Sequence, residues 1–316
     1  MQSDGTSVEL VTIGHTLCET IVFADGRRAG PVLGSPAAYA SAVAARLGVR
    51  TGIVSKVGSD APANLTQPLR DVGVDLSGID DRSPVTTTNE LVYAADGTKE
   101  LKYLKQAEPI SASDILNRYS QASAFYVCPL DYEVPLETVS QIARLRKLMA
   151  VDLGGYGGAH ARRDTAEQKK MSSAALHELI SSFNIVKASD EDAHLIFGGE
   201  RRLSDEESAC RLLQAGANIG IITRGPKGSL VFTKDKKYVL PALPGSVIDV
   251  TGGGDCYMAG FLVEFMRTGD PWQSGLFAAA VALCVIERAG GVRADRMPTR
   301  AEASKRIPPG IRPQVL

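Results

Sequence analysis

VIDVTGGGDCYMAGFLVEFMRTGDPWQSG, residues 247–275, is the most informative stretch of this chain. After three consecutive glycines, apolar residues continue toward Gly269, and this pattern predicts a long helix that begins near Gly254. Asp270 suits the N-cap of a second helix directly after it. Because a helix N-terminus has unpaired N–H groups and the positive end of the helix dipole, the glycines at 252–254 predict an anion site.

Asp255 follows the glycines and lies in the first turn of the predicted helix. A carboxylate at this position can accept the proton of an attacking hydroxyl, while the N–H groups of Gly252, Gly253 and Gly254 form an anion hole for a phosphoryl group. The structural alternative is a tight turn followed by an acidic residue that favours the helix dipole. Taken alone, these four residues leave both interpretations open.

The composition is that of a globular protein and excludes several function classes. The chain has 316 residues, of which 44% are hydrophobic, and its 35 basic and 36 acidic residues give a net charge of −1. No basic run marks a nucleic-acid or membrane surface, so we expect neither partner. The five cysteines form no C-x-x-C pair, and the N-terminus lacks a signal peptide, which together favour a cytoplasmic protein. The longest apolar run, residues 276–286, is too short to span a bilayer.

Short strand-like runs alternate with helical patterns along most of the chain. This alternation predicts βαβ units, a mostly parallel central sheet and helices on both of its faces. The expected strands are residues 8–13, 51–54, 124–128, 148–151, 185–187, 219–223 and 230–233. The expected helices outside the glycine-led pair are residues 37–47, 63–71, 136–145, 171–181 and 205–215.

Two segments depart from this alternation, residues 20–34 and residues 85–106. Each resembles a β-hairpin, with turns expected at Asp25-Gly26 and Asp96-Gly97. We expect the two segments to form one small sheet that covers the site as a lid. Its outer face could pair two subunits, because exposed sheets favour association. The tail from Arg296 onward is rich in proline and arginine and is expected to pack loosely.

The motif IDVTGGGDCYMAGF resembles the D-x-T-G-A-G-D-x-F-x-x-G-F signature of the ribokinase-like (PfkB) carbohydrate kinases. The resemblance continues in the family's order along nearly the whole chain. Residues 33–48 resemble its substrate helix, residues 54–75 its V-G-x-D segment, residues 186–198 its N-x-x-E site, and residues 221–232 its T-x-G-x-x-G nucleotide turn. The matching residues of the signature are Asp249, Thr251, Gly252, Gly254, Asp255, Gly260 and Phe261.

The resemblance implies a single three-layer α/β/α ribokinase-like domain over residues 1–316, with the β-lid inserted in it. It implies transfer of the γ-phosphoryl group of ATP to a hydroxyl of a sugar, nucleoside or cyclitol, with Asp255 as the general base and Mg²⁺ held through water by Ser189 and Asp192. It leaves open a monovalent cation such as K⁺ at Asp249. The residues implied to bind ATP are Thr223, Arg224, Gly225, Lys227, Gly228, Ala278 and Cys284.

Several positions differ from the family's pattern. The residues implied to contact the acceptor are Glu19, Gly34, Ser35 and Tyr39, but Tyr39 replaces the usual asparagine and Glu19 the usual aspartate. Ser189 and Asp192 replace the asparagine and glutamate that organise magnesium and phosphate. The identity of the acceptor therefore stays open, and a non-catalytic ligand-binding or regulatory member of the fold is the alternative function.

A nicotinamide-dependent oxidoreductase on a similar sheet is a third hypothesis. The segment LGGYGGAH, residues 153–160, is rich in glycine but lacks the G-x-G-x-x-G spacing, because His160 stands at the last position. There is also no G-x-x-x-x-G-K-[ST] sequence, so the chain is not a P-loop kinase. The kinase with Asp255 as base is the interpretation that the sequence favours.

Overall fold

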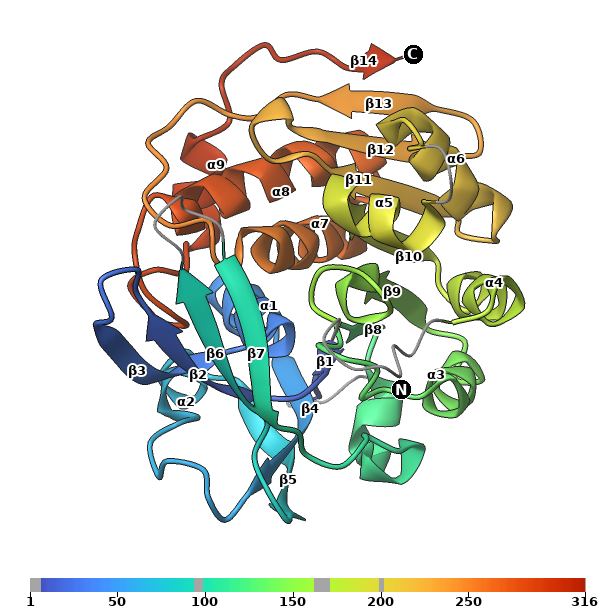
Figure 1. Ribbon diagram of the computed structural model, residues 1–316. Helices are drawn as coiled ribbons and strands as arrows, with labels where there is room; N and C mark the ends of the chain where they lie inside the picture. The colour runs from blue at the N-terminus through green and yellow to red at the C-terminus, as the bar shows by residue number, and fades with distance from the viewer. Residues whose placement is uncertain (1–6, 94–98, 162–170, 199–201, 316) are drawn as a thin grey trace.

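The computed structural model describes residues 7–93, 99–161, 171–198 and 202–315. Within these ranges one large sheet lies between two layers of helices, and a smaller sheet stands beside it (Figure 1). This is the three-layer α/β/α arrangement that the alternation of strands and helices predicted. Short 3₁₀ turns complete the connections at Ala112–Asp114, Asn117–Gln121, Leu153–Gly155 and Gly225–Lys227.

The main sheet has ten strands among the described residues, in the order β14-β13-β12-β11-β10-β9-β8-β1-β4-β5. The strands from β11 to β5 pair in parallel, whereas β12, β13 and β14 extend the other edge in antiparallel pairing. The strands are β1 Leu10–Ile13, β4 Thr51–Gly58, β5 Asp75–Ser83, β8 Ala124–Val127, β9 Leu148–Asp152, β10 Ile185–Ser189, β11 Ile219–Thr223, β12 Ser229–Thr233, β13 Lys237–Leu240 and β14 Gln314–Val315.

Each face of this sheet packs against its own group of helices and has its own hydrophobic core. One core contains side chains of α1 Pro36–Arg46, α2 Gln67–Asp71, α7 Gly253–Thr268, α8 Pro271–Ile286 and α9 Arg300–Lys305. The other contains side chains of α3 Leu136–Ala143, α4 Ser173–Ser181, α5 Asp190–Phe197 and α6 Asp205–Gln214. Both helices of the glycine-led pair form as predicted, since α7 ends at Gly269 in a left-handed C-cap and the Asp270 carboxylate accepts the first N–H groups of α8.

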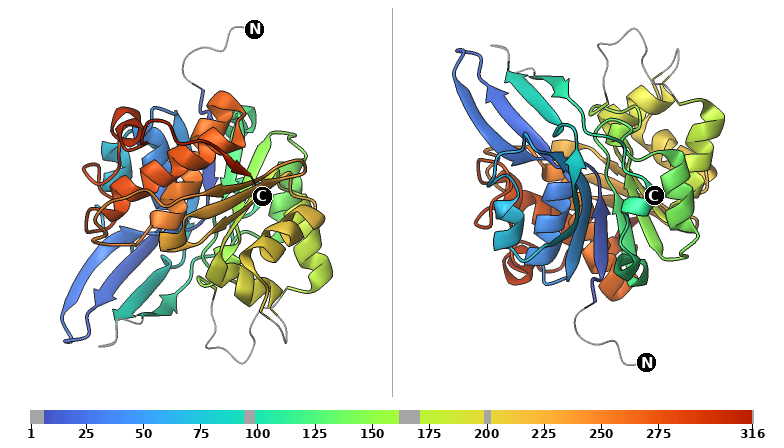
Figure 2. Two further views of the ribbon diagram at one scale, coloured as in Figure 1. Left: turned by 90° about the horizontal axis from the view of Figure 1, so that it is seen from above. Right: turned by 90° about the horizontal axis from the view of Figure 1, so that it is seen from below.

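The lid segments form one sheet, as the sequence predicted, in the order β3-β2-β6-β7. Its strands are β2 Leu17–Val22, β3 Arg28–Gly34, β6 Thr88–Tyr93 and β7 Lys99–Lys105, and the pairing of β2 with β6 is parallel. Figure 2 shows this sheet projecting from one side of the main body. The Tyr103 hydroxyl of β7 donates a hydrogen bond to the carbonyl oxygen of His160 at 3.0 Å, so the lid contacts the loop that follows β9.

The turn of the first lid hairpin lies where it was expected. Gly26 has a φ of 82°, and its N–H donates to the carbonyl oxygen of Phe23, which closes the turn after Asp25. The second expected turn, at Asp96-Gly97, lies outside the described residues. Both hairpins pair their strands in antiparallel fashion.

The prediction for the C-terminal tail was wrong. Arg296 is only 1% exposed, α9 packs on the α8 face, and β14 pairs with the edge of the main sheet. The reason is that buried carbonyl groups solvate the Arg296 side chain, which composition alone cannot indicate. Helix α2 is also shorter than expected, because residues 63–66 form turns before it. In the described part of the chain, no helix is long and apolar enough to cross a membrane.

Candidate active site

The candidate active site lies where the parallel strands of the main sheet end. Ligands of open α/β sheets bind beside this carboxyl edge. In the register of the sheet, Thr223 at the end of β11 pairs with Ser189 of β10, and Lys187 of β10 pairs with Asp152 of β9. The N-terminus of α7 reaches the same edge, because a Cβ placed on Gly254 would lie 3.1 Å from Nζ of Lys187.

The glycine turn, residues 252–254, is shaped by a close contact from α1. Gly252 is the N-cap of α7 with a φ of 75°, a conformation that glycine adopts without strain. A Cβ on Gly252 would lie 2.5 Å from the ring of Tyr39. The N–H of Gly253 donates to a carbonyl oxygen of the preceding turn at 3.1 Å, whereas those of Gly252, Gly254 and Asp255 have no acceptor among the described residues. These three N–H groups are free for an anion, and Gly253 does not contribute its own.

A buried ion pair lies beneath the glycine turn. Nζ of Lys187 is 2.7 Å from Oδ2 of Asp152, and Oδ1 of Asp152 accepts the N–H of Gly154 at 3.0 Å. Burial acts to lower the pKa of Lys187, but the charges of Asp152, Asp192 and Asp255 outweigh burial and raise it. A positive charge therefore lies beside the glycine turn. Sequence reasoning missed Lys187, although a lysine inside the apolar strand β10 was a signal.

Asp255 is 8% exposed at the start of α7, and no described residue forms a hydrogen bond with its carboxylate. Burial raises its pKa to about 6; Asp152 and Asp192 add to the rise, while the charges of His160 and Lys187 oppose it. Near neutral pH the carboxylate is ionised, and its oxygens are free of hydrogen bonds from the described residues. A base with a pKa close to the working pH is well suited to general base catalysis.

Ser189 and Asp192 form a closed capping box at the start of α5. The Ser189 hydroxyl accepts the N–H of Asp192 and the Asp192 carboxylate accepts the N–H of Ser189, both at 2.9 Å. Oδ1 of Asp192 also accepts the N–H of Ala159 at 2.8 Å. Burial acts to raise the pKa of Asp192, but Lys187, His160 and these N–H groups hold it below its ordinary value.

The same residues test whether magnesium fits here. In the part of the chain that the structure describes, no three His, Cys, Asp or Glu side chains are grouped to hold a metal ion. Magnesium usually keeps several waters and binds through one or two carboxylates together with substrate phosphates. The oxygen donors of Ser189 and Asp192 fit an ion held through water, and they do not form a protein cage.

The turn between β11 and β12 carries the other residues that were expected at the phosphates. Gly228 has a φ of 79°, and a Cβ there would lie 2.0 Å from a carbonyl oxygen of β13, so this position requires glycine. Gly225 and Lys227 are exposed, and Thr223 is half-buried at the end of β11. The turn therefore presents Lys227 to solvent at the carboxyl edge of the sheet.

The side chain of Arg224 makes local contacts. Its Nη2 donates to the carbonyl oxygen of Lys227 at 2.9 Å, and its Nη1 lies 4.0 Å from Oδ2 of Asp205. Its buried Nε has no partner among the described residues. Arg224 thus lies against the start of α6, whereas Lys227 is exposed to solvent.

Ala278 and Cys284 of α8 were expected to border adenine, but Ala278 is not accessible to a ligand. It is fully buried, and its Cα would lie 3.3 Å from a Cβ placed on Gly260. It therefore packs between α7 and α8 and has no surface for a ligand. Cys284 is 8% exposed and lies close to the Arg306 side chain.

An apolar surface that the sequence did not single out precedes the glycine turn. Val247, Ile248 and Val250 are 60%, 64% and 59% exposed. The N–H of Ile248 donates to the carbonyl oxygen of Ile286 at 2.8 Å, which fixes this segment against the end of α8. An exposed apolar patch beside an anion site is suited to a flat, apolar group attached to phosphates.

On the lid side, Glu19 lies where an acceptor residue was expected. Oε2 of Glu19 accepts a hydrogen bond from Nδ2 of Asn89 at 3.1 Å, and a Cβ on Gly34 would lie 3.5 Å from the Glu19 Cβ. Oδ1 of Asn89 is buried and has no partner among the described residues. The Ser35 hydroxyl accepts the N–H of Ala38 as the N-cap of α1. Asn89 was missed because only the register of β2 with β6 brings it to Glu19.

Tyr39 is 3% exposed, and its ring packs under Gly252. Its hydroxyl accepts a hydrogen bond from Nη1 of Arg296 at 3.0 Å. This position leaves Tyr39 little surface for the acceptor contact that the sequence indicated. Nη2 of Arg296 lies 3.4 Å from Oδ2 of Asp249, so the neighbourhood of Asp249 already holds a positive charge.

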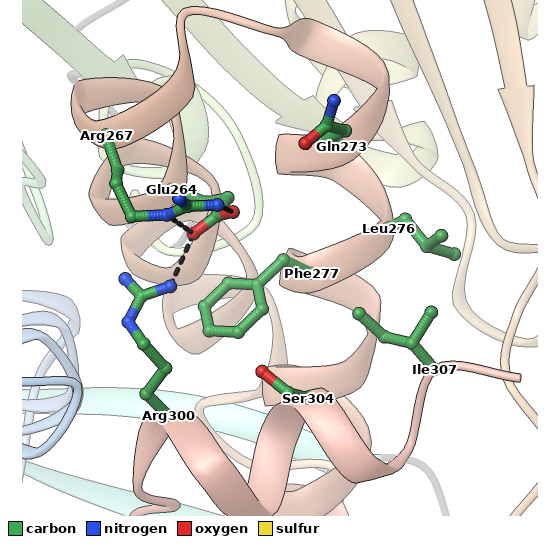
Figure 3. A pocket seen from close by; sticks show the side chains of 8 residues that line it. All are labelled: Glu264, Arg267, Gln273, Leu276, Phe277, Arg300, Ser304 and Ile307. Carbon is green, nitrogen blue, oxygen red and sulfur yellow. Dashed lines mark hydrogen bonds and ion pairs between the residues drawn. The ribbon is translucent and has the colours of Figure 1, made fainter. Parts of the chain in front are cut away.

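A separate surface pocket lies between the far ends of α7 and α8 (Figure 3). There Glu264 pairs with Arg267 and Arg300, and the Arg300 guanidinium is 4.8 Å from the centre of the Phe277 ring. Glu264 is ten residues beyond Gly254 in α7, a distance of about 15 Å at 1.5 Å per residue. The pocket is therefore not part of the candidate active site. Its other lining residues are Gln273, Leu276, Ser304 and Ile307.

Comparison with known proteins agrees with this geometry. Residues 32–300 match the model of the pfkB family of carbohydrate kinases. A cytidine kinase of Thermococcus kodakarensis is 31% identical over 265 residues, which cover 82% of this chain and 89% of the relative. A nucleoside kinase of Methanothermobacter thermautotrophicus is 25% identical over 320 residues, covering 95% of each.

Solved structures share the fold. A putative ribokinase II from E. coli in complex with ATP and Mg²⁺ superposes with a TM-score of 0.75 at 20% identity, covering 95% of this chain and 99% of that one. The family match, the curated relatives and the arrangement around Asp255 agree with one another. The chain belongs to the pfkB family of carbohydrate kinases and is a phosphotransferase that acts on a hydroxyl group.

Proposed function

We propose that this protein transfers the γ-phosphoryl group of ATP to a hydroxyl of a nucleoside, with Asp255 as the general base. The observation that carries the proposal is the difference between three neighbouring carboxylates. Asp152 is bound to Lys187 and Gly154, and both oxygens of Asp192 accept backbone N–H groups. The carboxylate of Asp255 has no such partner among the described residues, so it is the group free to accept a proton.

The reaction follows from these positions. The acceptor oxygen attacks the γ-phosphorus and forms the new P–O bond, and its proton passes to the carboxylate of Asp255. The bond between the γ-phosphorus and the bridging oxygen breaks, and its electron pair leaves with ADP. The free N–H groups of Gly252 and Gly254 and the ammonium of Lys187 stabilise the charge that develops on the phosphoryl oxygens.

The donor is proposed to lie along the carboxyl edge of the main sheet. Lys227, which is exposed in the turn after β11, is proposed to contact the donor phosphates, and the exposed Val247, Ile248 and Val250 are proposed to contact adenine. Magnesium, when bound, would supply positive charge that neutralises part of the charge of the donor phosphates. The residues that would hold it through water are Ser189 and Asp192.

The inner face of the lid favours a nucleoside over a simple sugar. In the register of β2, β6 and β7, Glu19, Asn89 and Tyr103 are neighbours, and side chains paired across strands share one face. Two residues further along lies a second row of neighbours, made of Ile21, Leu91 and Leu101. The polar row suits ribose hydroxyls, and the apolar row suits the face of a base.

An assay of acceptors and donors tests the proposal. The enzyme would be offered cytidine, inosine, ribose, fructose and myo-inositol, each with MgATP or with magnesium pyrophosphate, and the products identified by ³¹P NMR. We expect a nucleoside with MgATP to have the highest kcat/KM, at least tenfold above ribose. A preference for fructose or myo-inositol would contradict the nucleoside assignment, and equal use of pyrophosphate would contradict the adenine surface.

A pair of lid variants tests where the nucleobase of the acceptor binds. Leu91→Ala removes the buried side chain at the centre of the apolar row and should raise the KM for nucleosides several-fold more than the KM for ribose. Leu104→Ala is the matched control, because Leu104 is 58% exposed and lies on the opposite face of β7. Equal effects of the two variants would contradict the assigned orientation.

The non-catalytic alternative rested on the changes at Ser189 and Asp192. Against it stands the closed capping box, in which serine and aspartate keep the hydrogen bonds that orient the start of α5. The unhindered Asp255 also opposes it. Absence of turnover with every acceptor and donor of the panel, in a folded protein that binds ATP, would favour the alternative.

A further inference from the structure

Arg296 is the largest fully buried side chain of the described residues, and its surroundings are those of a cation site. Its Nη2 donates to the carbonyl oxygens of Asp249 at 3.1 Å and Thr251 at 2.9 Å. Its Nε donates to the carbonyl oxygens of Val285 at 3.2 Å and Arg288 at 2.9 Å. Backbone carbonyls from two separate segments therefore converge on one positive charge.

The remaining contacts close this cage. Nη1 donates to the carbonyl oxygen of Gly290 and to the Tyr39 hydroxyl, the latter at 3.0 Å. The carboxylate of Asp249 contributes the balancing negative charge, with Oδ2 at 3.4 Å from Nη2. The same carboxylate accepts hydrogen bonds from the N–H groups of Thr251 and Gly290. Asp249 therefore fixes the backbone of the cage as well as balancing its charge.

The chemistry of these oxygens explains why they hold a cation. Val285 lies in the last turn of α8 and Arg288 lies two residues beyond its end, so both carbonyl oxygens lie near the negative end of the helix dipole. Converging carbonyl oxygens are also how proteins replace the hydration shell of a monovalent metal ion. A guanidinium has the same single positive charge and five N–H donors, which match several carbonyls at once.

We propose that the guanidinium of Arg296 takes the place of a monovalent metal ion in this cage, so that the protein needs no potassium. The cage does not fit K⁺, because its oxygens already contact the guanidinium nitrogens. Arg296 is a positioning residue: it fixes the carbonyl of Thr251 directly before the glycine turn, and it holds the hydroxyl of Tyr39, whose ring supports Gly252. The effect on turnover rests on the proposed kinase function, whereas the effect on stability does not.

The first test uses the unmodified protein. Tm and turnover would be measured in KCl, NaCl and tetramethylammonium chloride at equal ionic strength. We expect the three Tm values to agree within about 1 °C and the turnover values to agree within twofold. A Tm or a turnover that rises specifically with K⁺, by more than about 3 °C or fivefold, would overturn the proposal. Since Tm is measured without substrates, it remains informative if the wrong acceptor was chosen.

The second test empties the cage. Arg296→Ala should lower Tm by roughly 5–10 °C, because the carbonyl oxygens of the cage lose their donor and the partly buried Asp249 loses its ion-pair partner. Millimolar guanidinium or K⁺ should restore part of the lost Tm and turnover, whereas tetramethylammonium is too large to enter. Arg293→Ala is the control, since Arg293 pairs with Asp295 at the surface and should show neither the loss nor the rescue. A Tm loss without rescue by either cation would contradict a cation site, and if Arg296→Ala does not fold, the first test decides alone.

Discussion

Replacing Asp255 with asparagine separates its chemical role from its structural one. Asparagine has nearly the same shape and leaves the N–H groups of the glycine turn free, but it cannot accept the proton of the acceptor. We expect kcat to fall by roughly 10²–10⁴, the usual contribution of a positioned general base, while the protein stays folded and binds ATP. If Asp255 only favoured the helix dipole, kcat would not change and stability would fall by about 0.3–1 kcal/mol.

The raised pKa of Asp255 gives this variant a second signature. The pKa rises from 3.8 to about 6, and each pKa unit corresponds to 1.36 kcal/mol, so ionising the carboxyl group costs the folded state about 3 kcal/mol. Below pH 3.8 both states are protonated and the cost is absent. Between pH 3.8 and 6 the unfolded state loses its proton first, so stability falls as the pH rises, and above pH 6 the full cost remains. Roughly half of it, about 1–2 kcal/mol, develops between pH 5 and pH 8.

Asparagine carries no charge, so this pH-dependent loss should disappear in the variant. Burying the amide has its own cost, but that cost is the same at every pH. Urea unfolding of both proteins at pH 5 and pH 8 should therefore show the asparagine variant gaining about 1–2 kcal/mol of stability relative to the aspartate protein over this interval. Asp270→Asn is the control for kcat, because Asp270 caps α8 and asparagine is also a good N-cap, so turnover should not change. A stability difference that does not change with pH would refute the raised pKa of Asp255. Undiminished turnover would refute its role as the general base.

Further predictions concern the rest of the site. The kcat/KM of the unmodified enzyme should rise with pH around a midpoint near 6 and then level off, since Asp255 must be ionised to act; a flat profile from pH 5 to 8 would argue against this base. Lys187→Met should raise the donor KM and destabilise the fold by about 3–5 kcal/mol, because Asp152 stays buried without its partner. Adding Asp152→Asn should recover most of the lost stability. If no stability is recovered, the pairing of Lys187 with Asp152 is contradicted. Glu19→Gln should raise the acceptor KM and leave the donor KM unchanged, so equal effects on both would place Glu19 elsewhere. The lid is proposed to pair two subunits, and light scattering after size exclusion should give a dimer; a monomer at micromolar concentration would refute this pairing.

The features that sequence predicted well are those determined over short distances along the chain. The glycine turn, the first turn of α7 and the N-cap Asp270 depend on residues within a few positions of one another, so their local conformations follow from local rules. The sheet and the lid followed from hydrophobic alternation. Strand β5 was not predicted, because its sequence DLSGIDDRS is mostly polar and it lies at the edge of the sheet.

The features that sequence did not predict depend on pairing between distant segments. Lys187 meets Asp152 because β10 pairs with β9 in one particular register, and Asn89 meets Glu19 because β6 pairs with β2. Neither register is specified by the pattern of either strand alone. The sequence predicted free N–H groups at Gly252, Gly253 and Gly254, and among the described residues those of Gly252 and Gly254 have no acceptor. The N–H of Gly253 is occupied by a hydrogen bond that depends on how the preceding turn closes.

Two departures from expectation, at Tyr39 and in the C-terminal tail, have one structural cause. Tyr39 stands where the family pattern has asparagine, and its ring can lie under the glycine turn only because Gly252 has no Cβ. In that position the Tyr39 hydroxyl is buried and needs a donor, which Arg296 provides. Arg296 in turn needs the carbonyl cage to be buried at all, and this requirement holds the tail against the core. The tyrosine, the glycine and the arginine therefore form one arrangement, in which the C-terminal segment of the chain holds Tyr39 and the glycine turn in position.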